Sequence, residues 1–180
     1  ISGTDAGLFD VDSASGEITF KVSPNYETKN SYSLSLTATD SSDATDTQAL
    51  TVTVTDANDS PEFSAATATG SVAENAATST QIFDANSTDE DTGDALTYTV
   101  AGADAGLVNI DSSTGVVSLK SSANFETKTS YSFNVLASDG NSSATQAVIV
   151  SVTNENEAPT VTSSTAGTVS ENEATSTVIY

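Results

Sequence analysis

The chain has 180 residues, of which 25 are acidic and only 4 are basic, giving a net charge of −21. A nucleic-acid partner is nearly excluded, and so is an anionic membrane surface, because both need a patch of lysine and arginine. The partners that suit so many carboxylates are cations, water or a basic surface. The chain contains neither cysteine nor histidine, which excludes disulfides, thiolate metal sites and the usual zinc ligand.

Alternation of apolar and hydroxyl residues dominates the sequence from one end to the other. In chain order, the predicted strands are Ile18–Val22, the segment with Tyr32, Leu34, Leu36 and Ala38, the segment with Leu50, Val52 and Val54, then Thr80–Phe83, Leu96–Val100 and two segments around Tyr131–Ala137 and Val148–Val152. A period of two predicts half-buried antiparallel strands, and Gly, Asn, Asp and Ser clusters mark the turns between them. No stretch has a helical period. Several short strands per hundred residues predict an all-β fold of the β-sandwich type.

The sequence repeats itself with a period of about 98 residues. Residues 3–40 recur at 102–139, and residues 70–83 recur at 167–180. An acidic and amide-rich run that ends in proline closes each period, as DANDSPEF at 56–63 and as NENEAPTV at 154–161. We therefore expect residues 1–60 to be the later part of one repeat, 61–158 a complete repeat and 159–180 the start of a third. The first of these, without its opening strands, is expected to leave a sheet edge exposed.

The runs between repeats have the chemistry of a cation site. Asp56, Asn58 and Asp59 place three oxygen-bearing side chains within four residues, and they repel one another unless a cation lies among them. Ca²⁺ takes six to eight oxygens in a flexible geometry, whereas Mg²⁺ requires a tighter octahedron, so Ca²⁺ fits better. A solvated polar linker is the alternative.

Six motifs in a fixed order carry a resemblance to a known family. They are Glu-Asn at 74–75, Asp89-Glu90-Asp91 ahead of Leu-Thr-Tyr at 96–98, Ile-Asp-Ser-Ser-Thr-Gly at 110–115, Asn-Phe-Glu at 124–126, Ala-Ser-Asp at 137–139 and the DANDSPEF run, and most of them occur twice. In this order the chain resembles cadherin repeats, and its Ser/Thr-rich, Lys-poor and Cys-free style is similar to the bacterial cadherin-like type. The resemblance implies tandem Greek-key, immunoglobulin-like β-sandwiches that bind calcium at each junction.

The resemblance also implies which residues bind the metal. At the first junction they are Glu27, Asp56, Asn58, Asp59, Asp89, Asp91 and Asp139. At the second junction they are Glu74, Glu126, Asn154, Asn156 and Glu157.

Some positions depart from the family pattern. Asn25 and Asn124 stand where the family often has aspartate, and Asn154 and Glu157 replace the two usual aspartates of the linker. Because an amide carries no charge, we expect fewer or weaker ions, especially at the second junction.

The expected function is that of a calcium-binding extracellular or cell-surface repeat, for cell adhesion or rigid spacing within a large surface or secreted protein. Its expected partners are calcium, the neighbouring repeats and other cell-surface proteins or polysaccharide. A polysaccharide-binding β-sandwich is the alternative, although the chain has no tryptophan for an aromatic platform. An enzyme is not expected, since the acidic residues are accounted for by the junctions and no histidine or cysteine supplies other chemistry.

Overall fold

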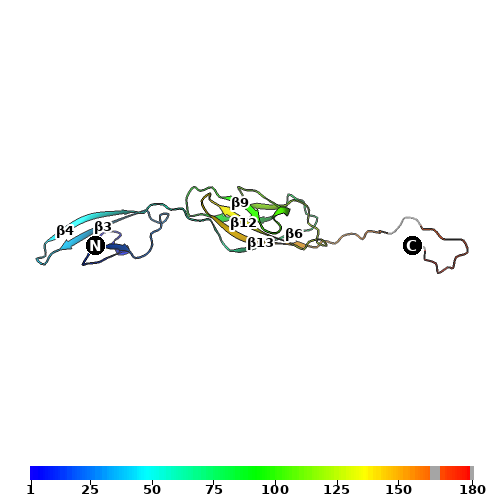
Figure 1. The fold of residues 1–180 in the computed structure, drawn as a ribbon, viewed down its shortest axis with the longest axis horizontal. Helices are drawn as coiled ribbons and strands as arrows, with labels where there is room; N and C mark the ends of the chain where they lie inside the picture. Colours follow the sequence, from blue (N-terminus) through cyan, green and yellow to red (C-terminus); the bar gives the residue numbers. More distant parts are fainter. Residues whose placement is uncertain (163–166, 179–180) are drawn as a thin grey trace.

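The structure is a computed structural model that describes residues 1–162 and 167–178. The chain is drawn out along one axis (Figure 1). At one end lies a first unit, whose elements run from Ala6 to Thr53, and in the middle lies a second unit, called the complete unit here, whose elements run from Glu62 to Thr153. The C-terminal segment lies beyond it. Within the described residues, no helix is both long enough and apolar enough to cross a membrane.

The first unit consists of two separate pairs of strands. Its elements are the 3-10 turn η1 (Ala6–Leu8), β1 (Phe9–Val11), β2 (Ile18–Phe20), β3 (Ser31–Thr39) and β4 (Thr45–Thr53). β1 pairs with β2 and β3 with β4, both antiparallel. Among the described residues β4 pairs with β3 and with no other strand. A small cluster of Phe9, Tyr32 and Leu34 forms the buried part of the unit.

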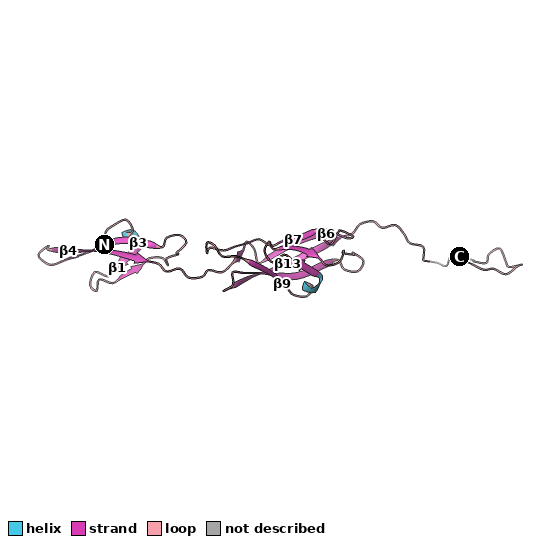
Figure 2. Cartoon of the chain, turned by 90° about the horizontal axis from the view of Figure 1, so that it is seen from above, coloured by secondary structure: helices cyan, strands magenta, loops and turns pink. Residues whose placement is uncertain are grey.

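The complete unit contains the rest of the strands. They are β5 (Glu62–Phe63), β6 (Thr67–Ala73), β7 (Gln81–Asp84), β8 (Ser87–Thr88), β9 (Thr97–Ala101), β10 (Val108–Ile110), β11 (Val116–Leu119), β12 (Ser130–Ser138) and β13 (Ser143–Thr153), with the 3-10 turn η2 (Ala105–Leu107) before β10. Figure 2 shows them as a compact stack of strands with η2 at its side.

Two main sheets build this unit. One has the order β6-β13-β12-β9, in which β6 runs parallel to β13 and the other neighbours are antiparallel. The other has the order β10-β11-β7, and β5 pairs with β8 in a small third sheet. The core lies between the main sheets, where Val117, Val135 and Val150 are fully buried. The alternating residues of β13 contribute to this core, because every second side chain of a strand points to the same face.

The predicted all-β fold is confirmed, and the predicted strands differ from the observed ones only slightly in their bounds. The sequence analysis did not predict the strands β1, β5, β6, β8, β10 and β11. The strand expected at Ile18–Val22 ends at Phe20, and those expected at Leu96–Val100 and Thr80–Phe83 are each displaced by one residue, to Thr97–Ala101 and Gln81–Asp84. The absence of a helical period agrees with the two 3-10 turns, which are too short to produce one. Of the expected third repeat, residues 163–166 and 179–180 lie outside the described residues, and residues 167–178 contain no strand.

Candidate metal centre at the junctions

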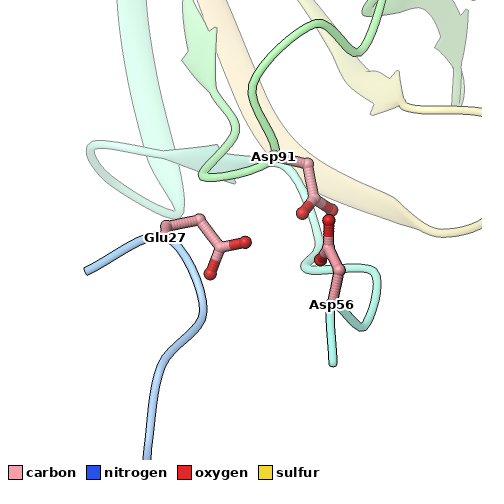
Figure 3. Close-up of side chains that lie close together, drawn as sticks. All are labelled: Glu27, Asp56 and Asp91. Carbon is pink, nitrogen blue, oxygen red and sulfur yellow. The ribbon is translucent and has the colours of Figure 1, made fainter. Parts of the chain in front are cut away.

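Three segments bring carboxylates together where the first unit meets the complete unit. Glu27 lies in the loop after β2, Asp56 lies in the linker after β4, and Asp91 lies in the loop after β8. One carboxylate oxygen from each of these residues lies within 4.8 Å of the others. Figure 3 shows the three side chains pointing into the same space from three separate stretches of chain. Glu27, Asp59 and Glu90 form a second set with the same closeness.

Hydrogen bonds fix the linker to the complete unit. The backbone N–H of Asp59 donates to Oδ2 of Asp91 over 2.8 Å, and Nδ2 of Asn58 donates to Oδ2 of Asp139 over 3.0 Å. The pKa of Asp139 lies well below its usual range, because the backbone N–H and the hydroxyl of Ser142 donate to its carboxylate, as does Asn58. The linker is therefore held against charged oxygens.

Asp89 has one carboxylate oxygen without a partner. Its Oδ1 accepts the backbone N–H of Asp91 over 3.0 Å, whereas its buried Oδ2 has no hydrogen-bond partner. A buried acceptor without a partner is costly, and each such atom needs an explanation. A cation at the junction would supply the missing interaction.

The carboxylates of this junction repel one another. Burial raises the pKa of Asp59, and the nearby Glu90 and Asp91 raise it further. The hydrogen bond from its own backbone N–H opposes the shift at Glu27, but burial and the neighbouring Asp56 leave the pKa of Glu27 raised. Burial and the charge of Asp91 also raise the pKa of Asp94. A raised carboxyl pKa means that the surroundings disfavour the charged form.

The four lysines, which are the only basic residues of the chain, contact other groups. Lys29 pairs with Asp5 over 2.6 Å and Lys128 with Asp104 over 3.0 Å. Lys21 and Lys120 donate to the carbonyls of Gly7 and Gly106, and Lys21 also lies 3.9 Å from Asp10. No basic side chain is thus left to neutralise the first junction, so the positive charge has to come from outside the chain.

The second junction is built differently, around a carboxylate that is already satisfied. Glu74, Glu126 and Glu157 lie within 4.8 Å of one another, and Glu74 is only 2% exposed. Its two oxygens accept the backbone N–H groups of Glu155 and Phe125, over 2.8 and 2.9 Å. The first of these bonds is the main reason why the pKa of Glu74 is lowered.

Amide side chains complete this second cluster. Asn154 donates to Glu126 over 3.1 Å, and Asn75 donates to Glu157 over 3.3 Å. Asn156 is exposed and makes no side-chain hydrogen bond within the described residues. Of the residues expected here, all but Asn156 are therefore brought together.

At the first junction the structure gathers the expected residues and adds two others. Glu27, Asp56, Asp59 and Asp91 form the carboxylate clusters, while Asn58, Asp89 and Asp139 are joined to them by the linker and its loop. The sequence reasoning missed Glu90 and Asp94, both of which lie at the junction. Glu90 is the central residue of an acidic triplet, and that triplet was the available signal.

Comparison with known proteins agrees with this geometry. Residues 68–153 match the family model described as "Cadherin domain". This chain belongs to the cadherin family. Over 142 residues it is 33% identical to protocadherin Fat 4 of Mus musculus, an alignment that covers 76% of this chain and 3% of the relative. The chain therefore spans 3% of the length of the curated relatives that it matches.

Solved structures show the same fold. The extracellular cadherin domains 1–4 of protocadherin gamma B7 superpose with a TM-score of 0.64 and 28% identity, covering 82% of this chain and 39% of that one. Mouse cadherin-23 EC22-24 superposes with a TM-score of 0.63 over 83% of this chain and 50% of that one, and at 24% identity it shows the fold alone.

These relatives confirm the cadherin resemblance, the immunoglobulin-like sandwich and the extracellular or cell-surface location. They favour a cadherin repeat over a polysaccharide-binding module, and the cadherins among them are adhesion proteins rather than enzymes. The bacterial subtype stays a prediction.

Proposed function

We propose that this cadherin chain is an array of repeats, divided at residues 60/61 and 158/159, which calcium ions stiffen at the junctions for adhesion or spacing in a larger surface or secreted protein. The observation that carries the proposal is the meeting of Glu27, Asp56 and Asp91 within 4.8 Å, from the two units and the linker between them. An ion bound there contacts all three segments at once.

The donor set suits calcium. The proposed ligands at the first junction are Glu27, Asp56, Asn58, Asp59, Asp89, Asp91 and Asp139, with Glu90 added by its position. They supply carboxylate and amide oxygens from loops, and Ca²⁺ accepts six to eight such ligands. The partnerless Oδ2 of Asp89 supports the assignment.

The mechanism is a change in stiffness. Without the ion, the carboxylates repel one another and the linker lets the two units swing. With the ion, the repulsion becomes attraction to a shared charge, and the two units are fixed relative to each other. An extracellular module binds Ca²⁺ with a Kd of about 10⁻⁴–10⁻³ M. At about 100 times Kd, one such site stabilises the bound state by roughly 2.7 kcal/mol.

The second junction is proposed to bind more weakly. Its candidate ligands are Glu74, Glu126, Asn154, Asn156 and Glu157, of which two are uncharged. In addition, both oxygens of Glu74 already accept backbone N–H groups. Fewer free negative oxygens mean a smaller gain from a cation.

Thermal unfolding of the full chain tests the proposal. We expect the midpoint to rise by about 10 °C in saturating calcium compared with excess chelator, and much less in magnesium. Asp91→Asn should remove most of this rise, because it deletes one charge and keeps the size of the side chain. Asp46→Asn, at an exposed position of β4 away from both junctions, is the matched control and should keep the rise in full. A midpoint independent of calcium would refute the proposal.

A further inference from the structure

Outside the linker, one hydrogen bond among the described residues joins the first unit to the complete unit. Nδ2 of Asn25, in the loop after β2, donates to Oε2 of Glu90 over 2.8 Å. We infer that Asn25 and Glu90 form a clamp that holds one side of the first junction in the absence of calcium. This inference rests on the proposed function, since it describes what the junction does when the ion leaves.

The amide of Asn25 is oriented by its own loop. Its Oδ1 accepts the backbone N–H of Thr28 over 2.6 Å, in a turn of the kind that asparagine favours. With the oxygen engaged there, the NH₂ group faces the complete unit and can only donate. The acceptor is a carboxylate, and hydrogen bonds to ionised groups are the stronger ones.

The clamp acts where the repulsion is strong. The carboxylate of Glu90 lies with those of Glu27 and Asp59 within 4.8 Å, and it contributes to the raised pKa of Asp59. A donor on Glu90 offsets part of this repulsion without any ion. The residue type at position 25 therefore decides whether the two loops attract or repel each other in calcium-free solution.

When calcium is removed, the first junction then becomes a hinge and does not become fully flexible. The contact between Asn25 and Glu90 keeps the two loops together, and the motion that remains is rotation about this contact. When calcium returns, the cluster of Glu27, Asp56 and Asp91 already lies close to its bound arrangement.

The second repeat supplies a control position. Asn124 has the same turn, with its Oδ1 accepting the backbone N–H of Thr127 over 2.8 Å. In the part of the chain that the structure describes, its NH₂ group has no acceptor in another unit. Substitution there alters the same type of turn and leaves the contact with Glu90 intact.

The test measures the distance between the two units of the full chain. Because the chain has no cysteine, spin labels can be placed on cysteines introduced at the exposed positions Thr51 and Thr99. Double electron–electron resonance then gives the distribution of distances in chelator and in calcium. Asn25→Asp keeps the acceptor for Thr28 but replaces the donor by a negative charge. We expect its distribution in chelator to be at least twofold wider than that of the natural sequence, and equally narrow in calcium.

Three further variants sharpen the result. Glu90→Gln retains an acceptor oxygen and should keep the narrow distribution in chelator, whereas Glu90→Ala should widen it. Asn124→Asp should leave both distributions unchanged. The clamp is refuted if Asn25→Asp has the width of the natural sequence in chelator, or if it stays wide in calcium, which would indicate a damaged loop. Failure of the proposed calcium function would appear separately, as no narrowing of the natural sequence on adding calcium.

Discussion

The first unit and the complete unit contain the same hairpin in different surroundings. In the first unit Tyr32 of β3 lies opposite Val52 of β4, and in the complete unit Tyr131 of β12 lies opposite Val150 of β13. The register is the same because the alternating pattern is the same, although the loop spans residues 40–44 in the first unit and only residues 139–142 in the complete unit. The hairpin is therefore specified locally.

The burial of this hairpin is not specified locally. Val135 and Ala137 are 0% exposed, whereas their counterparts Leu36 and Ala38 are half-buried and exposed, respectively. In the complete unit β9 pairs with β12 and β6 with β13, and the second sheet covers the inner face. The comparison shows that the pattern creates a strand pair, while a core requires segments far away in the sequence.

Removal of a large core side chain should give the largest difference in lost stability between the two units. Phe133→Ala is expected to cost about 3–5 kcal/mol, because Phe133 is 2% exposed in a closed core and leaves a cavity. Leu34→Ala, at the matching position, is expected to cost only about 2 kcal/mol, since its small cluster can close up against solvent. Native-state hydrogen exchange on the full chain gives the opening free energy of each hairpin. Equal losses in both units would contradict the comparison.

Two glycines at matching positions of the repeated turn should give a smaller difference in stability between the units. Gly16 and Gly115 have φ angles of +77° and +76°, and a side chain at Gly16 meets nothing whereas one at Gly115 meets the carbonyl oxygen of Ala85. Gly16→Ala should therefore cost about 1 kcal/mol, the strain of a left-handed conformation. Gly115→Ala should cost about 3 kcal/mol, because the backbone at Ala85 has to move as well. Hydrogen exchange again reports each unit, and a similar cost at both positions would mean that the strand ending at Asp84 is free to shift.

The smallest effect concerns a single hydroxyl group. The hydroxyl of Ser113, together with backbone N–H groups, lowers the pKa of Asp111 to about 2. In the first unit Asp12 matches Asp111, and Ala14, which has no hydroxyl, matches Ser113. Ser113→Ala should raise the pKa of Asp111, which a carboxyl-detected NMR titration measures. The folded-state pKa lies below the unfolded one, so the charged Asp111 stabilises the unit above about pH 4. This contribution is lost as the pH falls towards 2, and in the variant it should be smaller. An unchanged pKa would show that the backbone groups alone hold the carboxylate.

The sequence predicted seven of the thirteen described strands for a physical reason. Alternation and turn residues are local signals, and the Tyr32 hairpin has both. Short strands such as β5 and β8 escaped because two residues carry no period. The contact between Asn25 and Glu90 could not be foreseen either, because it depends on the angle at which two separately folded units meet. The partnerless oxygen of Asp89 likewise emerged only from three-dimensional packing.

The parallel pairing of β6 with β13 has a mechanical consequence. Seven residue pairs, from Thr67 with Ala147 to Ala73 with Thr153, join a strand near the beginning of the unit to the strand at its end. A pull along the array acts at the start of β6 and at the end of β13, which lie at opposite ends of this pair. The load is then applied in shear, so the hydrogen bonds between the two strands must break together. In a hairpin pulled from one end, by contrast, the hydrogen bonds break one after another. Tension along the array is thus resisted by all seven residue pairs of this sheet edge at the same time.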